Sequence, residues 1–313
     1  MNTETITQVN SIFEQPWWLE AVSPGEWEAA EIEQDGRIIA RLPYVRGKRL
    51  GCRMVGMPEY TQTLGYWTED TGAKNARKYA REKELVTELI QKLPKGCSVD
   101  LDLDHRCEYL FPFRWAGYKV QMQYSYRLED IRDRDQLWSG LADNIRREIK
   151  KAQKQVKVED NHPIDDLILL QEKTFQRQGR TQEGSSELLR RLDKVLVEKN
   201  ARKLLCAVDD SGRIHSAAYF VYDSNCCYYL VGGGDPELRT SGAASLLMWE
   251  GIQFASSVSK AFDFEGSMIE PIERFFRAFG GKPVPYWRVI KLNSFLSFAD
   301  YMKPKIKKIL GWK

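Results

Sequence analysis

Residues 113–119 read FRWAGYK and residues 276–282 read FRAFGGK, so the pattern F-R-x-x-G-x-K recurs 163 positions later (276 − 113). The same offset aligns residues 99–102 (VDLD) with residues 262–265 (FDFE), which alternate apolar and acidic side chains in both places. A repeat of this length is far too long for one unit of a solenoid. The sequence therefore predicts two copies of one domain.

Length and composition fit a globular chain of two ordinary domains. The 313 residues are 42% hydrophobic and 29% charged, which allows each copy its own core. A net charge of +3 is too small to indicate nucleic acid by itself, and we expect no DNA partner. The six cysteines form no C-x-x-C pair and the three histidines are scattered, so we expect a reduced, cytoplasmic chain without a metal site.

The two ends of the chain bear on targeting and membranes. The N-terminus is polar and acidic, unlike a signal peptide, and no apolar run approaches the roughly 20 residues of a membrane span. The basic tail, residues 303–313, mixes lysines with Ile, Leu and Trp. Such a tail either rests peripherally on an anionic membrane or docks as a helix on its own domain.

Hydrophobic periodicity and turn residues predict the same order of elements twice: a helix, antiparallel strands, then helix, strand, helix, strand. In the second copy we expect helices over 185–200, 242–257 and 270–281, and strands over 203–208, 214–222, 227–231, 261–265 and 286–292. In the first copy we expect helices over 16–22 and 75–93, and strands over 27–34, 37–45, 98–103 and 118–128.

The division into domains follows from this order. Residues 1–132 form the first copy and residues 159–313 the second. Between them, residues 133–158 are highly charged and mostly helical in pattern, which is typical of a connector.

Four stretches, in this order along the chain, match motifs of one known family. They are FEQPWWL at 13–19, NIRREIKKA at 144–152, RTSGAA at 239–244, and FDFEGS at 262–267 followed by ERFFRAFGG at 273–281. The chain resembles the FemABX family of peptidoglycan-bridge aminoacyltransferases. That resemblance implies an α+β fold with a mixed sheet, built as two tandem GCN5-related N-acetyltransferase (GNAT)-like domains from an internal duplication.

The resemblance also implies an activity. It indicates an N-acyltransferase that moves an aminoacyl or acyl group from aminoacyl-tRNA or acyl-CoA to an amine of a cell-wall precursor, a sugar or a lipid. The donor is a co-substrate, and no tightly bound cofactor is expected. The long paired-helix arm that some members use beside tRNA is absent from this sequence. The alternative is an inactive duplicated scaffold that binds a nucleotide-sugar or RNA.

The segment 239–244 is the predicted donor site. A glycine turn that opens a helix presents unpaired N–H groups and the positive end of the helix dipole, which together attract phosphate. The alternative is an ordinary helix cap. The donor-binding candidates are Arg239, Thr240, Ser241, Gly242, Ala243 and Ala244. The corresponding residues 68–74 of the first copy carry two acids and no such motif, so we expect only the second copy to hold phosphate.

The glycine run 232–234 has two interpretations. In the GNAT fold the corresponding strand splays from its neighbour and the amide arm of the donor binds there. The glycines and the following Asp235-Pro236 are equally compatible with a plain turn.

Three residues are catalytic candidates. Asp263 and Glu265 lie two apart on a predicted strand and would face the same side, where like-charge repulsion raises one pKa toward that of a general base. Glu265 is the better candidate because it is nearer the strand end. The alternative for these acids is a structural pair with Arg274 or Arg277. Tyr286 could protonate a leaving group or fill the core.

Cations of the connector are the candidate acceptor or RNA contacts. Residues 146, 150, 154 and 157 share one face at helical spacing, although such runs are usually solvated faces. The substrate-binding candidates are Arg146 and Lys150 in the connector, with Arg177 and Arg180 further on.

Overall fold

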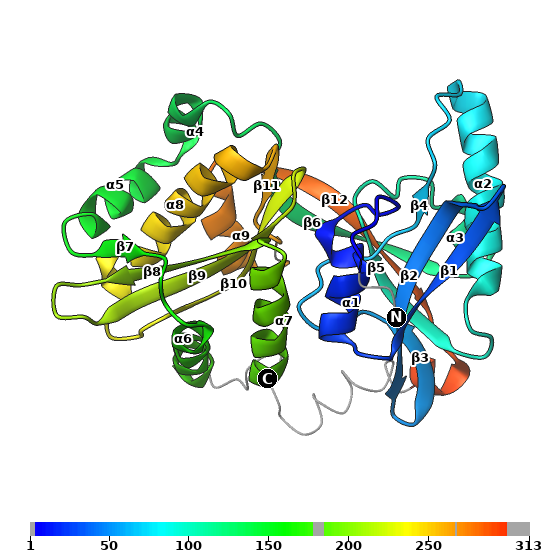
Figure 1. The fold of residues 1–313 in the computed structure, drawn as a ribbon, viewed down its shortest axis with the longest axis horizontal. Helices are drawn as coiled ribbons and strands as arrows, with labels where there is room; N and C mark the ends of the chain where they lie inside the picture. The colour runs from blue at the N-terminus through cyan, green and yellow to red at the C-terminus, as the bar shows by residue number, and fades with distance from the viewer. Residues whose placement is uncertain (1–3, 178–184, 267, 299–313) are drawn as a thin grey trace. The chain divides into compact units, whose positions relative to one another are not determined.

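The computed structural model describes residues 4–177, 185–266 and 268–298. These residues form two compact units. The first contains the chain up to Gln123 and the chain from Tyr286 onward, and the second runs from Tyr124 to Pro285. Each unit contains strands and helices (Figure 1), and the strands of each unit form one part of the sheet order.

The sheet of the first unit has the strand order β1-β2-β3-β5-β12, with β4 on β2. The β1–β2, β2–β3 and β5–β12 pairs are antiparallel, whereas β3 and β5 are parallel. The strands are β1 (Trp27–Gln34), β2 (Arg37–Arg49), β3 (Cys52–Gly56), β4 (Trp67–Thr68), β5 (Ser98–Leu103) and β12 (Lys282–Lys291). The helices are η1 (Ile12–Glu14), α1 (Pro16–Val22), α2 (Asn75–Lys92) and α3 (Phe111–Trp115).

The core of the first unit lies between this sheet and helices α2 and α3. The inner face of α2 contributes Leu85, Val86 and Leu89, and α3 contributes Phe113. The opposite sides of these helices carry exposed side chains, among them Lys83 and Glu84 on α2 and Trp115 on α3. This arrangement leaves an outer surface on both helices.

The sheet of the second unit has the order β6-β11-β10-β9-β8-β7. Here β10 and β11 are parallel and the other pairs are antiparallel. The strands are β6 (Lys119–Leu128), β7 (Lys157–Glu159), β8 (Arg202–Val208), β9 (Ile214–Tyr222), β10 (Cys226–Gly234) and β11 (Ala261–Asp263). The helices are α4 (Arg134–Gly140), α5 (Asp143–Ala152), α6 (Ile164–Arg177), α7 (Ser186–Glu198), η2 (Arg239–Ser241), α8 (Ala243–Val258) and α9 (Glu270–Arg277).

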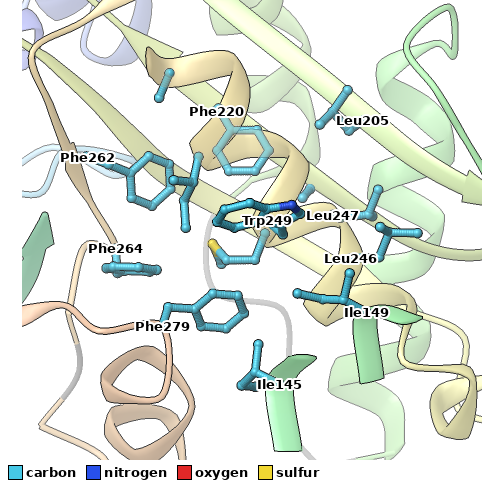
Figure 2. Close-up of a cluster of buried hydrophobic side chains, with 14 of the residues drawn as sticks. Ile145, Ile149, Leu205, Phe220, Leu246, Leu247, Trp249, Phe262, Phe264 and Phe279 are labelled. Carbon is cyan, nitrogen blue, oxygen red and sulfur yellow. The ribbon is translucent and has the colours of Figure 1, made fainter. Parts of the chain in front are cut away.

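The two faces of this sheet are covered by different helices (Figure 1). Helices α5 and α8 cover one face, and α6 and α7 the other. Under α8 lies an aromatic core in which Phe220, Phe262 and Phe264 meet Trp249 and Phe279 (Figure 2). Aromatic side chains bury a large apolar area each, so this cluster fixes the end of β11 against the helices.

The sequence repeat is a repeat of structure. In both copies a helix ends on a left-handed glycine, and the next strand begins two residues later. Gly117 and Gly280 both have φ of 83°, a conformation that glycine adopts without steric cost. Their N–H groups donate to the carbonyls of Arg114 and Arg277 at 3.0 and 3.1 Å. The predicted mixed α/β order, repeated twice, is confirmed.

The closing strands are distributed differently from the expected division at 132 and 159. The end of β6 comes from the first copy in sequence but belongs to the second unit, where Arg127 pairs with Asp263 on β11. The end of β12 pairs in the first unit, from Trp287 to Lys291, with β5. Each sheet therefore includes a strand end contributed by the other copy.

The connector is not one helix. It consists of α4 and α5, after which the chain becomes extended and β7 pairs with β8. Lys154 and Lys157 therefore lie beyond the helix, and the expected single face of residues 146, 150, 154 and 157 is wrong. The alternation of residues 155–159 (QVKVE), with Val156 buried, is the strand signal that competed with the charge pattern.

Candidate active site

The central feature of the second unit is the parting of its two parallel strands. β10 pairs with β11 over three residues, ending at Tyr228 opposite Asp263. Its pairing with β9 continues to Gly234, with a bulge between Tyr229 and Val231. Residues 229–234 of β10 therefore run on past the end of β11. We call this divergence, together with residues 264–266, the wedge.

The glycines of β10 are required by close neighbours and not by a turn, because β10 stays extended through Gly234. A Cβ at Gly232 would lie 2.0 Å from the Tyr229 hydroxyl, and one at Gly233 would lie 2.7 Å from the backbone of Gln171 on α6. No side chain fits at such distances. The turn interpretation of the glycine run is therefore wrong, and the splayed strand is present.

Asp263 at the end of β11 has a structural partner. Its carboxylate accepts hydrogen bonds from Arg127 Nη1 at 2.7 Å, from the Ser125 hydroxyl, and from the backbone N–H of Glu265 at 2.8 Å. Both Arg127 and Asp263 are buried. The expected alternative, an acid paired with arginine, thus holds for Asp263, but the arginine comes from β6 instead of α9.

Glu265 is left without such a partner. Among the described residues its Oε1 is buried and makes no hydrogen bond. Burial, and then the nearby negative charge of Asp263, raise the pKa of this carboxyl well above its usual value of 4.5. The residue as a whole is half-buried. A raised pKa makes the ionised carboxyl a stronger proton acceptor than an ordinary glutamate.

The backbone places Glu265 in this position. Its φ of 52° is left-handed, which takes it off the strand and away from the face of Asp263. At the next residue, Gly266, a Cβ would lie 2.3 Å from Ser125 Cα. The close approach of β6 therefore forces the chain to turn here, and the expected common face of Asp263 and Glu265 is wrong. A left-handed non-glycine residue is costly and often marks a functional site.

Tyr229 lies near this carboxyl. Burial raises the pKa of Tyr229 to about 12, and the charge of Glu265 adds to this rise. Tyr229 therefore stays protonated over the physiological range. The wedge thus combines a neutral phenol, a carboxyl with a raised pKa and a strand that has left its neighbour.

The predicted donor loop is built as the sequence indicates, although Gly242 has a packing role. η2 leads into Gly242, whose φ is 82°, and α8 follows. A Cβ at Gly242 would lie 2.6 Å from the carbonyl oxygen of Glu148 on α5. Close approach of α5 is thus enough to require glycine here.

Side chains of α5 also contact the loop. Glu148 accepts a hydrogen bond from the Ser245 hydroxyl at 2.5 Å, and Lys151 donates to the Thr240 carbonyl. Ser241 and Ala243 are buried, with the Ser241 hydroxyl accepting from the Ala243 N–H at 3.3 Å. The surface open to an anion is formed by the exposed residues of the loop, Arg239, Thr240 and Ala244.

The remaining predicted residues belong to other elements or lie outside the described residues. The Arg146 guanidinium bonds the carbonyls of Trp138 and Ser139, which joins α5 to the end of α4. Lys150 is exposed on α5. Arg177 is the last residue of α6, its side chain lies outside the described residues, and so do Arg180 and the tail 303–313. Tyr286 belongs to the first unit.

The first unit repeats the strand divergence. β3 and β5 are paired only from Met54 opposite Ser98 to Val55 opposite Val99. A cavity of about 420 Å³ lies there, lined by Gly56, Lys48, Asp100, Asp102 and Arg288 among others. Burial raises the pKa of Asp102, the counterpart of Glu265 at the 163-residue offset, to about 6, with Arg288 opposing the rise. Sequence reasoning missed this cavity because the phosphate motif is absent from the first copy.

Two further features bear on ligands. Among residues 4–177, 185–266 and 268–298, no group of three His, Cys, Asp or Glu side chains could hold a metal ion. Within the same residues, no helix has both the length and the apolar character needed to traverse a bilayer.

Comparison with known proteins shows that part of the chain is similar to a known domain family. Residues 139–266 match the model of the acetyltransferase (GNAT) domain. No curated protein sequence matches this chain. The matched range begins in α4 and ends at Gly266, so it includes both the donor loop and the wedge.

Solved structures resemble the whole chain. The crystal structure of FemX superposes with a TM-score of 0.66 at 13% identity, covering 92% of this chain and 97% of that one. The C-terminal domain of a putative lysylphosphatidylglycerol synthetase from Agrobacterium fabrum gives 0.59 at 10% identity, covering 90% and 89%. A tandem GNAT protein from the clavulanic acid biosynthesis pathway gives 0.52 at 11% identity, covering 91% and 89%. At these identities the likeness is one of fold.

Proposed function

We propose that this chain is a FemABX-like N-acyltransferase of the GNAT superfamily, and that it transfers an aminoacyl or acyl group to an amine with Glu265 as the general base. The observation that carries this proposal is the Glu265 Oε1 atom in the wedge, which is buried and has no hydrogen bond among the described residues. A structural acid at this position would have a partner, as Asp263 has in Arg127.

The proposed reaction is a direct transfer. The acceptor nitrogen attacks the carbonyl carbon of the donor, a C–N bond forms, and the bond from that carbon to oxygen or sulfur breaks. The nitrogen loses a proton to the Glu265 carboxylate, and that proton passes to the leaving oxygen or sulfur, which departs as a hydroxyl or thiol and leaves Glu265 ionised again. Positioning of the two substrates supplies much of the rate, and general-base catalysis contributes about 10²–10⁴-fold.

Backbone groups of β10 are the proposed oxyanion donors. Beyond Tyr228 this strand has no β11 beside it, so amides on that side face the wedge. N–H groups fixed by a strand need no reorganisation during the reaction, which makes them effective at stabilising the negative charge on the carbonyl oxygen.

For the substrates we propose an aminoacyl-tRNA or acyl-CoA donor held by residues 239–244, and an amine on a cell-wall precursor, a sugar or a lipid as acceptor. Arg239 supplies a cation, and the start of α8 supplies a favourable dipole. The names of two solved structures with a similar fold are consistent with these substrates. One is called a lysylphosphatidylglycerol synthetase and another a GNAT protein described without AcCoA.

The test is a transfer assay on the full chain. Acetyl-CoA and charged tRNA are offered with a panel of amino sugars, amino lipids and peptide amines, and acylated products are identified by mass spectrometry. We expect Glu265→Gln to slow transfer by about 10²–10⁴-fold. Glu250→Gln is the matched control, because burial also raises the pKa of Glu250 but this residue lies on α8.

The outcomes separate the parts of the proposal. Product with wild type but unchanged turnover in Glu265→Gln would remove Glu265 from the mechanism while leaving the transferase. Binding of RNA or a nucleotide-sugar with no product from any donor would favour the inactive scaffold.

A further inference from the structure

A ladder of aromatic rings lies on the outside of the first unit. Tyr79 on α2 stacks on Tyr109, which contacts Phe111 on α3, which in turn stacks on Trp115. Successive ring centroids are 5.4, 5.5 and 5.6 Å apart. We call these four residues the aromatic ladder.

The ladder is exposed. Tyr79, Phe111 and Trp115 expose 39, 57 and 62% of their surface. Scattered single apolar side chains on a surface are ordinary, but a contiguous row of large rings marks an interaction site. The row therefore requires an explanation other than core packing.

Helix α3 shows the division between core and surface within five residues. Pro112 and Phe113 are buried against the sheet. Phe111, Arg114 and Trp115, spaced by three and four residues, form its outer face. Packing against the sheet therefore accounts for Phe113 but not for Phe111 and Trp115, which lie at the surface.

The second copy shows that the fold does not need the outer rings. At the 163-residue offset, Phe276 retains the buried place of Phe113, while Arg274 and Ala278 stand where Phe111 and Trp115 stand in the first copy. The same helix, with the same glycine after it, is thus built without exposed aromatic rings. Packing alone does not account for the ladder.

Cations lie at the α3 end of the ladder, whereas charges of both signs lie around Tyr79. Lys83 Nζ lies 5.6 Å from the centre of the Trp115 ring, and Arg114 is exposed between the two α3 rings. In residues 108–119, Glu108 is the single acid against Arg114 and Lys119. Along α2, cations outnumber acids by five to three: Arg77, Lys78, Arg81, Lys83 and Lys92 against Glu82, Glu84 and Glu88.

We propose that the aromatic ladder is a docking surface for an anionic lipid bilayer. Trp, Tyr and Phe rings enter the boundary between headgroups and acyl chains, and adjacent Lys and Arg side chains contact the acidic headgroups. A cationic rim with exposed aromatic rings matches both parts of that boundary. This proposal does not depend on the acyl-transfer reaction.

The experiment is co-sedimentation of the full chain with vesicles of phosphatidylcholine alone and of phosphatidylcholine with phosphatidylglycerol. We expect binding to the anionic vesicles, weakened by added salt because the cations lie in solvent. The variant Phe111→Ala/Trp115→Ala should bind at least about tenfold more weakly. The matched control is Leu169→Ala/Val197→Ala, which removes two side chains of similar exposure, 52 and 51%, from the second unit.

Folding of each variant is checked by its far-ultraviolet circular dichroism and melting temperature. Equal binding by Phe111→Ala/Trp115→Ala and wild type would overturn the proposal, as would absence of wild-type binding to anionic vesicles. A wild-type dimer in sedimentation equilibrium that the double substitution dissociates, without vesicle binding, would assign the ladder to a second copy of this chain instead.

Discussion

Breaking the buried pair of Arg127 and Asp263 should strongly destabilise the second unit. The two side chains expose 7 and 4% of their surface, and their charged atoms are 2.7 Å apart. Arg127→Met leaves the Asp263 carboxylate buried with its cation removed. An uncompensated buried charge of this kind costs about 3–5 kcal/mol.

A second arginine–aspartate pair, which is exposed, serves as the control for this destabilisation. Arg132 and Asp130 are 2.6 Å apart, but 83 and 58% of these side chains are exposed. Such exposed pairs contribute about 0–1 kcal/mol, so Arg132→Met should change little. The comparison therefore isolates burial from the chemistry of an arginine–aspartate pair.

The assay is thermal unfolding by calorimetry. The second unit runs from Tyr124 to Pro285, a length for which each kcal/mol shifts the melting temperature by about 2–4 °C. Arg127→Met should therefore melt roughly 6–20 °C below wild type, and Arg132→Met within a few degrees of it. Equal melting temperatures for the two variants would refute the reasoning that this pair holds the end of β11.

Two further changes test the packing and the electrostatics. Gly233→Ala should lower the free energy of unfolding in denaturant by about 1–3 kcal/mol, because the new Cβ would meet the α6 backbone at 2.7 Å. The control Gly140→Ala has open space around the new Cβ and should not destabilise the chain. Equal stability of the two variants would contradict the close approach of α6. Glu14 is fully buried, and burial raises its pKa from 4.5 to about 7. Its contribution to the free energy of unfolding is therefore complete below pH 4.5. That contribution falls by about 3 kcal/mol as pH rises to 7, because the carboxyl ionises first in the unfolded chain. Unfolding of Glu14→Gln, measured from pH 4 to 8, should lack that component; a profile parallel to wild type would show that Glu14 has an ordinary pKa.

Local patterns predicted most of the elements. The strands 27–34 and 98–103 and the helix 16–22 have the predicted bounds, because their periodicity and turn residues are strong. The repeat aligned Gly117 with Gly280, and the helix before Gly280 was predicted, but helix α3 before Gly117 was not. Helix α6 was missed although Ile164, Leu167 and Ile168 recur at helical spacing.

The site was only partly predictable because its geometry depends on contacts distant in sequence. The partner of Asp263 is 136 residues away, on β6, so local spacing pointed instead to α9. The left-handed turn at Glu265 follows from the approach of β6 to Gly266, which no local pattern encodes. Sequence reasoning preferred Glu265 to Asp263 as the base because of its place at the strand end, and that preference stays a prediction.

The most direct test of the account is the titration of the Glu265 carboxyl, followed by carbon-13 NMR of the labelled chain and assigned by its absence in Glu265→Gln. The account predicts a midpoint well above 4.5, because the carboxyl is buried without a hydrogen bond at Oε1 and lies near the charge of Asp263. A midpoint at the ordinary glutamate value would show a solvated acid and contradict its assignment as the general base.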